Sequence, residues 1–348
     1  MITDVRALPG ARVVTLAEGQ GYFPVLVATP TGAVIGVLRG GAAHFGVRGR
    51  LDLVTSTDGE TFSAPRSIVD SDWDDRNPAL GVAADGTLIL AYHRQGSYRD
   101  DGSWDRSLRR AETCLTRSRD GGQTWDPPRI ISAGVPPGCS PYGRMVRPIA
   151  GGADDPETLL LPLYGYAAPG SDLVESWLVR SRDGGATFST PTLVARGYSE
   201  SAFVELPGGD LVGALRATDD GSLAVARSDD GGRSFTSPAR ITRPNEHPGD
   251  LVVLADGRLL LVFGQRNPPC GVAARLSDDG GRTFGEALVV WAESPTQDCG
   301  YPSAVRLPDG RILIAFYEVH GSVAHRNGPV EGCAARVVCF DERALPSR

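Results

Sequence analysis

A short turn motif that recurs five times is the feature that most constrains the fold of this chain. Its copies follow the pattern Ser-x-Asp-Gly-Gly-x-Thr/Ser-Trp/Phe, the first being one residue shorter, and lie at 56–62, 118–125, 181–188, 228–235 and 277–284. The Ser hydroxyl and the Asp carboxylate can accept backbone N–H groups inside a tight turn, and glycine allows a positive φ. The final aromatic residue supplies a large apolar anchor. This recurrence predicts a repeat architecture in which each copy fastens one hairpin.

Calcium loops are the alternative explanation of the motif, because they also begin with Asp-x-Gly-rich runs. No copy has the glutamate at the twelfth position that would complete an EF-hand loop. We therefore expect the five turns to be structural and to hold no metal. We expect no cofactor elsewhere in the chain.

A second repeat interleaves with the first and occurs six times. Each copy is an apolar run, a turn containing Asp or Gly, and a second apolar run, as in two paired strands. The copies lie at 25–38, 80–92, 148–164, 203–215, 251–263 and 304–317. A hairpin and the strands around one Ser–Asp turn make a four-stranded unit, and six such units predict an all-β, six-bladed β-propeller in one domain, residues 1–348. The segment 11–19 is expected to close the ring against the last blade, whose outer strands are expected around 332–340.

Composition excludes several classes of function. The net charge of −7 gives no electrostatic footprint for nucleic acid. All 35 basic residues are arginine, which rules out lysine Schiff-base chemistry and favours bidentate recognition of a carboxylate. The six cysteines form no Cys-x-x-Cys pair, so a zinc ribbon is not expected. With no apolar signal segment and no run of 18 apolar residues, we expect a cytoplasmic protein with free thiols and no membrane partner.

The five Ser–Asp turns resemble the Asp box, or BNR repeat, of the sialidase superfamily, and the resemblance covers nearly the whole chain. It implies a propeller whose turns lie away from the active site. Two segments resemble the family's catalytic strands, 197–206 (GYSESAFVEL) and 299–318 (CGYPSAVRLPDGRILIAFYE). They imply that Tyr301 is a nucleophile polarised by Glu200, and that Glu318 holds an arginine.

The resemblance also implies an arginine cluster for a substrate carboxylate. Arg216 ends the run VGALR at a family-like spacing after the catalytic glutamate, and Arg266 ends LLLVFGQR. A neutral tyrosine deprotonated by a glutamate suits an anionic sugar, because a carboxylate nucleophile would repel it. Arginines would grip the substrate carboxylate, and a separate acid would protonate the leaving oxygen.

Two positions depart from the family pattern. Phe23, in GYFPVL, stands where the family carries its first-strand arginine, and Arg39 is the candidate replacement from the neighbouring strand end. Where the family carries its general-acid aspartate, the obvious titratable residue is His44. Asp75 is an alternative relocated acid, and it precedes Arg76 at the predicted pocket mouth.

Two further residues begin predicted inner strands and are therefore pocket candidates, Tyr142 in the third blade and His247 in the fifth. The leading functional hypothesis is a glycoside hydrolase that cleaves a terminal acidic, sialic-acid-like sugar with retention. A polysaccharide lyase that uses His44 and Tyr301 with the arginines is the second hypothesis. An exo-glycosidase acting on uronate or neutral sugars, and a non-catalytic carbohydrate-binding propeller, are further alternatives. All of these predict a carbohydrate partner, and none predicts an oligomeric state.

Overall fold

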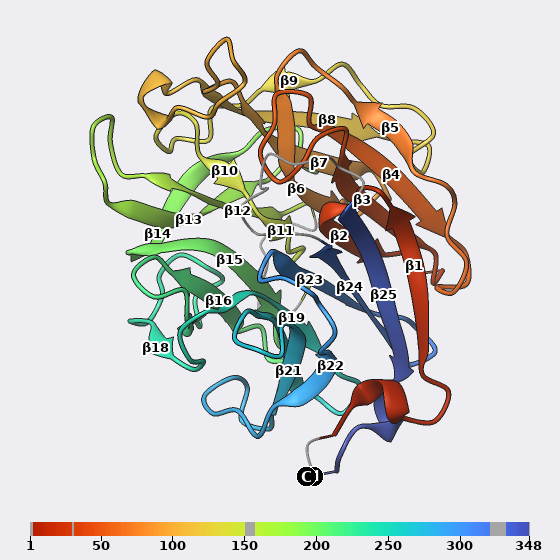
Figure 1. Ribbon diagram of the computed structural model, residues 1–348. Helices are drawn as coiled ribbons and strands as arrows, with labels where there is room; N and C mark the ends of the chain where they lie inside the picture. The colour runs from red at the N-terminus through yellow and green to blue at the C-terminus, as the bar shows by residue number, and fades with distance from the viewer. Residues whose placement is uncertain (1–2, 30, 150–156, 321–331, 348) are drawn as a thin grey trace.

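Six sheets, antiparallel except for one short parallel strand pair, surround a central axis in the computed structural model of the chain, as Figure 1 shows. The structure describes residues 3–29, 31–149, 157–320 and 332–347. Five of the sheets have four strands and one has five. The fold is therefore the predicted all-β, six-bladed propeller. No helix among the described residues is long and apolar enough to cross a membrane.

Blades one, four and five place their four strands in sequence order from the axis outward. Blade one contains β2 (Tyr22–Ala28), β3 (Val34–Gly40), β4 (Arg50–Ser56) and β5 (Arg66–Val69). Blade four contains β15 (Tyr198–Glu205), β16 (Leu211–Ala217), β17 (Leu223–Ser228) and β18 (Ala239–Arg240). Blade five contains β19 (Glu246–Val253), β20 (Leu259–Gln265), β21 (Gly271–Ser277) and β22 (Leu288–Trp291).

Blades two and three are less regular because the inner strand of blade three is broken. Blade two contains β6 (Asp74–Val82), β7 (Leu88–Gln95), β8 (Ala111–Ser118) and β9 (Arg129–Ile130). Blade three contains β10 (Ser140–Pro141), β12 (Leu159–Tyr166), β13 (Val174–Ser181) and β14 (Ser189–Arg196). After β10 the chain crosses to blade two, where β11 (Gly143–Arg144) pairs in parallel with β6.

The prediction of the third hairpin, at 148–164, is therefore correct only for its second strand. Its second run forms β12, but its first run contributes no regular inner strand, and its turn lies outside the described residues. Prolines at 136, 137, 141 and 148 flank or interrupt this stretch, and proline cannot donate to a strand ladder.

The last blade closes the ring with the N-terminal strand. It contains β23 (Cys299–Arg306), β24 (Arg311–Val319), β25 (Cys333–Asp341) and β1 (Arg12–Glu18). The register runs antiparallel from Arg12 opposite Cys339 to Glu18 opposite Ala334. In Figure 1 the red β1 lies beside the blue β25, which confirms the predicted closure.

Each Ser–Asp turn is held together by its own side chains. In the second copy, the Gly122 N–H donates to Ser118 Oγ (2.8 Å) and the Thr124 N–H donates to Asp120 Oδ1 (2.9 Å), while Ser118 Oγ donates to Asp120 Oδ1. Trp125 packs against the apolar cluster between blades one and two. The turns follow the third strands, so they lie at the rim opposite the ends of the second strands. No group of three or more His, Cys, Asp or Glu side chains suited to a metal occurs within the described ranges.

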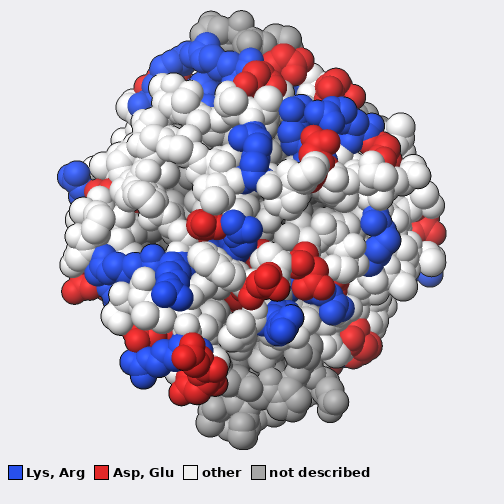
Figure 2. All heavy atoms as spheres, turned by 90° about the horizontal axis from the view of Figure 1, so that it is seen from above, with Lys and Arg blue, Asp and Glu red and all other residues white. Residues whose placement is uncertain are grey.

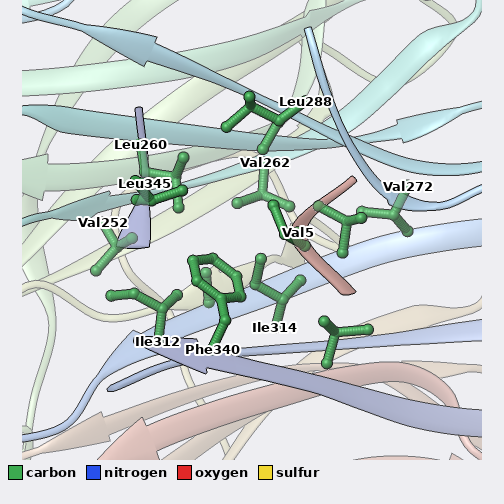
Figure 3. Close-up of a cluster of buried hydrophobic side chains, with 14 of the residues drawn as sticks. Val5, Val252, Leu260, Val262, Val272, Leu288, Ile312, Ile314, Phe340 and Leu345 are labelled. Carbon is green, nitrogen blue, oxygen red and sulfur yellow. The ribbon is translucent and has the colours of Figure 1, made fainter. Parts of the chain in front are cut away.

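Apolar clusters fill the space between adjacent blades. Figure 3 shows the cluster between blades five and six, where side chains such as Val262 and Leu288 meet Ile314 and Phe340. The short 3-10 helix η1 (Val5–Ala7) adds the fully buried Val5 to this cluster. Each such side chain contributes about 1.5–3 kcal/mol through removal of apolar surface from water. The blades therefore form a rigid frame for the residues at the axis.

Candidate functional site

The start of each inner strand lies at the same rim of the axis, and five of these strands have a register shift there. In three of the five, the residue at the shift has a positive φ. Phe23, Asn77 and Tyr301 have positive φ values of 54°, 48° and 50°, and each precedes a proline. The strand register shifts at each of them. Non-glycine residues in this conformation cost about 1–3 kcal/mol each and concentrate at functional sites. The bulges thus mark where inner-strand side chains line the axis.

Tyr301 and Glu200 meet at this rim. The Tyr301 hydroxyl donates a hydrogen bond to Glu200 Oε1 at 2.6 Å, and both side chains are buried. The two residues lie on β23 and β15, 101 positions apart in sequence. The predicted hydrogen-bond contact is present.

Arg216 completes a chain of three side chains. Its Nη1 donates to the second oxygen of Glu200, Oε2, at 2.5 Å. Burial alone raises the pKa of Glu200, but the Arg216 charge and the hydrogen bonds from Tyr301 and Arg216 outweigh burial and lower it. Burial, reinforced by the Glu200 charge, raises the pKa of Tyr301. At neutral pH the pair is therefore a carboxylate accepting a bond from a neutral phenol.

Arg266 also lies next to Tyr301. Its guanidinium lies over the Tyr301 ring, 5.6 Å from the centroid. Its Nε and Nη2 are buried and have no hydrogen-bond partner within the described part of the chain. The buried His247 has an unpartnered Nδ1, and burial followed by the charges of Arg216 and Arg266 lowers its pKa. The two Arg266 nitrogens are therefore donors available for an anion.

Aromatic rings surround the hydroxyl of Tyr301. The ring of Phe23 lies 4.7 Å from that of Tyr301, and the ring of Tyr142 lies 6.1 Å from it. All three residues line one cavity at the axis. Tyr142 is thus placed where the sequence predicted it, although its hydroxyl donates to the Gly249 carbonyl at 3.2 Å.

His44 also reaches the rim, and it has a partner that the sequence analysis missed. Its Nδ1 lies 2.8 Å from Asp298 Oδ1, and the Tyr317 hydroxyl donates to the same oxygen at 2.7 Å. The His44 ring contacts Phe23 edge-on at 5.1 Å. Asp298 directly precedes the Cys299–Arg306 strand, and this position was the available signal for it.

Arg39 does not line the cleft, contrary to the prediction. Its side chain is fully buried, and Nε and Nη2 donate to Asp74 Oδ1 at 2.9 and 2.7 Å. Nη1 donates to the carbonyls of Ala42 and Ala43. The guanidinium is therefore occupied by the protein itself, because a buried cation needs a partner where water cannot reach it.

Arg76 is placed at the rim, as predicted. Its guanidinium lies over the rings of Phe23 (5.4 Å) and Phe45 (4.7 Å), and its Nη1 contacts Asp74 Oδ2 at 3.3 Å. Asn77, which the sequence analysis did not select, follows it and donates to Tyr164 Oη at 3.1 Å. The X-Pro pattern at the inner-strand starts was the signal for Asn77.

Asp75 does not face the central cluster, which corrects its prediction as the relocated acid. Asp75 accepts bonds from the N–H and hydroxyl of Ser71, because alternate side chains of a strand face opposite ways and Asp74 takes the side with Arg39 and Arg76. Burial raises the pKa of Asp75 to about 6.

Glu318 does contact an arginine, but it is not an arginine of the central cluster. Arg336 Nε donates to Glu318 Oε1 at 2.5 Å, and Trp291 Nε1 donates to Oε2 at 2.9 Å. Arg336 also contacts Thr15 of β1, so this group belongs to the outer part of blade six.

Charges elsewhere on the surface are mixed. The face in Figure 2 shows arginines interspersed with Asp and Glu, without one continuous patch of either sign. The exposed arginines commonly pair with carboxylates, as Arg240 does with Asp219 and Asp220. Surface pairs of this kind add little stability. The unpaired donors of Arg266 at the axis thus differ from the exposed arginines that pair with carboxylates.

Comparisons with known proteins agree on the fold. The family model described as a BNR repeat-like domain matches residues 73–314. A crystal structure of a protein of unknown function from Dyadobacter fermentans DSM 18053 is 24% identical, covers 95% of this chain and 99% of its own, and has a TM-score of 0.77. No curated protein sequence matches the chain.

Two of the similar structures are named as sialidases. The Hadza microbial sialidase Hz136 is 19% identical, with 94% of this chain and 66% of that chain covered and a TM-score of 0.71. The intramolecular trans-sialidase of Ruminococcus gnavus, solved with oseltamivir carboxylate, is 16% identical, with 98% and 99% covered and a TM-score of 0.67. At these identities the likeness shows the shared fold.

Proposed function

The chain belongs to the BNR repeat-like domain family, and we propose that it is a retaining exo-glycosidase that removes a terminal acidic, sialic-acid-like sugar from a glycan. The observation that carries this proposal is the chain of contacts from Tyr301 through Glu200 to Arg216. A phenol that donates to a buried carboxylate has a base within reach of its proton, which is the geometry an activated nucleophile needs. The sialidase names of similar structures support the same reaction class.

The reaction would proceed in two steps. In the first, Tyr301 Oη bonds to the anomeric carbon while its proton passes to Glu200 and the glycosidic oxygen leaves with a proton from an acid. In the second, water attacks the same carbon from the face that the leaving group vacated as the bond to Tyr301 breaks. The water gives one proton back to the acid of the first step, and the phenolate recovers its proton from Glu200. Two inversions give net retention of configuration.

Charge explains why tyrosine suits this site. An anionic sugar would be repelled by a carboxylate nucleophile, whereas the phenol of Tyr301 is neutral before the reaction. Arg266 is the cation at the axis without an ion-pair partner within the described residues, so it is assigned the substrate carboxylate. Arg216 forms an ion pair with Glu200, and its remaining donors are assigned to the substrate anion as well.

The deciding experiment removes one hydroxyl. Tyr301→Phe should lower turnover of a 4-methylumbelliferyl glycoside of sialic acid by about 1,000-fold or more while near-ultraviolet circular dichroism stays unchanged. Tyr92→Phe is the matched control, because the buried hydroxyl of Tyr92 has no hydrogen-bond partner in the described structure. Near-normal turnover by Tyr301→Phe would overturn the assignment. Binding of the sugar without turnover by the unaltered chain would favour a carbohydrate-binding propeller.

A lyase is the second candidate, and the environment of His44 is the observation that favours it. Burial lowers the pKa of His44 to about 4, so its imidazole is neutral at neutral pH and can accept a proton from carbon. β-Elimination from a uronate needs such a base, a neutralised carboxylate and a donor for the leaving oxygen. A product with an unsaturated uronate absorbs in the ultraviolet and a hydrolysis product does not, so one spectrum separates the two reactions.

A further inference from the structure

The Tyr301–Glu200 pair leaves one task of the proposed reaction unassigned, namely proton transfer at the glycosidic oxygen and the attacking water. The ring of Phe23 contacts both His44 and Tyr301, whose ring centroids lie 5.1 and 4.7 Å from its own. His44 is 7% exposed, so it is largely shielded from bulk water. Its place on the loop between β3 and β4 brings it to the rim from blade one.

One nitrogen of His44 is already in use. Nδ1 lies 2.8 Å from Asp298 Oδ1, which also accepts the Tyr317 hydroxyl at 2.7 Å. Burial alone raises the pKa of Asp298, but the hydrogen bond and charge of His44 outweigh it and lower it to about 2. An ionised carboxylate accepts hydrogen bonds and cannot donate them, so Nδ1 carries the hydrogen. The neutral ring therefore presents Nε2 as its basic atom.

The loop backbone around His44 is also fixed. Arg39 donates to the Ala42, Ala43 and Gly46 carbonyls, which flank His44 on both sides. Asp74 holds the other nitrogens of Arg39, at 2.7 and 2.9 Å. Blade two thus anchors a loop of blade one, and the ring and the backbone of His44 are held independently.

We propose that His44 is the proton-transfer residue of this site, acting through Nε2, and that Asp298 is the residue that positions it. The proposal rests on the glycosidase function proposed above. In the first step the hydrogen on Nε2 of the protonated ring passes to the glycosidic oxygen as the carbon–oxygen bond breaks. In the second step Nε2 takes a proton from the attacking water, whose oxygen bonds to the anomeric carbon as the bond to Tyr301 breaks. His44 is thereby returned to its starting state.

The charges around His44 set the pH at which each role is available. Asp298 and Tyr317 face it from blade six, Arg76 faces it from blade two and Arg266 from blade five, while the Tyr22 ring lies 5.8 Å away in blade one. Burial, assisted by Arg76 and Arg266, lowers the pKa of His44 to about 4, and Asp298 opposes the shift. If His44 acts as the acid, it must start protonated. The kcat/KM of the glycosidase for unactivated substrates should therefore fall as pH rises above about 4. A lyase that uses the neutral His44 ring as its base should instead have a kcat/KM that rises with pH over the same range.

Nuclear magnetic resonance of the full chain, labelled with ¹⁵N-histidine, tests the geometry without any assay. The His44 signals, assigned by their loss in His44→Gln, should show the tautomer with hydrogen on Nδ1. Asp298→Ala should change that pattern, whereas Glu318→Gln, a buried carboxylate of the same blade whose partners are Arg336 and Trp291, should not. Hydrogen on Nε2 in the unaltered protein, or unchanged signals in Asp298→Ala, would overturn the proposal.

Leaving-group dependence tests the role. His44→Gln should lower kcat/KM by about 100-fold or more for a methyl glycoside, which needs an acid, and by less than about threefold for a 4-methylumbelliferyl glycoside. Asp298→Asn should shift the descending pH limb for the methyl glycoside, and Glu318→Gln should leave the limb in place. Equal losses on both substrates, or an unmoved limb in Asp298→Asn, would overturn the role of this pair.

Tyr301→Phe distinguishes a failure of the nucleophile assignment from a failure of the His44 proposal. If that variant retains turnover while His44 keeps its tautomer and its leaving-group effect, the nucleophile assignment fails and the proton-transfer unit stands. If it loses turnover while His44→Gln behaves as the unaltered protein on both substrates, the nucleophile stands and His44 is excluded.

Discussion

The hydroxyl of Tyr301 lies 2.6 Å from Glu200 Oε1, although the two residues belong to blades six and four. Closure of the ring produces this proximity, since every inner strand begins at the same rim of the axis. The contact is buried, so the charge of Glu200 acts on the phenol with little screening by water. Both residues are therefore best tested by changes that preserve shape.

Glu200→Gln should reduce turnover of an activated aryl glycoside by about 100- to 10,000-fold, because an amide cannot take the Tyr301 proton. The amide oxygen can still accept the hydroxyl, so folding should be preserved. Steady-state kinetics and thermal unfolding of the same sample would check both statements. A variant that folds normally and turns over at a normal rate would remove Glu200 as the base.

The two central arginines should respond differently to substitution. Arg266 has no ion-pair partner within the described residues, so Arg266→Met should leave thermal stability nearly unchanged and weaken binding of an acidic sugar by about 10- to 100-fold. Arg216→Met removes the partner of Glu200 and should also lower stability. Calorimetric titration with an acidic and a neutral sugar checks this contrast. Equal losses for both sugars in Arg266→Met would contradict its role as a carboxylate ligand.

Much of the fold and the centre of the site could be predicted from local sequence. The Ser–Asp turns and hairpins are short-range patterns, and counting them gives the blades. The central site residues lie at the start of an inner strand or at the end of a second strand, and both positions reach the same rim of the axis. They are Tyr301, Glu200, Arg216 and Arg266.

The pairing of charges could not be predicted in the same way. Whether Arg39 serves a ligand or the protein depends on Asp74, which a neighbouring blade brings to it. Asp298 lies 254 residues from His44, and no local pattern joins them. Asp75 was assigned to the wrong face because successive side chains of a strand point in opposite directions. The sequence does not show which of Asp74 and Asp75 faces the axis at the start of this strand.

Arg39→Met should be strongly destabilising, because it leaves the carboxylate of Asp74 buried with less compensation. The expected loss is about 3–5 kcal/mol of the free energy of unfolding. Asp74→Asn in the same chain should recover part of this loss, since the two residues share a contact and their effects are not additive. Chemical denaturation of both single variants and the double variant measures the coupling. A loss below about 1 kcal/mol in Arg39→Met would contradict the anchoring role.

Asp75 should make stability fall with rising pH between about 4 and 6. Its folded pKa is raised to about 6, above an unfolded value of about 3.9. The unfolded chain therefore releases this proton first as pH rises, and above pH 6 the full cost, about 3 kcal/mol, applies. Asp75→Asn should be more stable than the unaltered chain at pH 7 and nearly equal to it at pH 4. A stability difference that does not change with pH would contradict the raised pKa.

The Ser–Asp turns offer a comparison between two adjacent carboxylates. Asp230 accepts bonds from the N–H groups of Arg233 and Ser234 and from the hydroxyls of Ser228 and Ser234. Asp229 is exposed, and these bonds of the turn go to Asp230 instead. Asp230→Ala should therefore lower the free energy of unfolding by about 1–3 kcal/mol, because backbone donors lose their acceptor, whereas Asp229→Ala should change it by less than about 0.5 kcal/mol.

Unfolding with and without calcium separates this explanation from a metal loop. If hydrogen bonds alone hold the turn, millimolar calcium should leave the unfolding midpoint of the unaltered chain and of Asp230→Ala unchanged. The reason is that donors within the turn already occupy the Asp230 carboxylate. A ligand that binds only the folded state must raise its stability in proportion to the logarithm of its concentration. A calcium-dependent rise that disappears in Asp230→Ala would therefore identify these turns as metal sites and overturn the structural assignment.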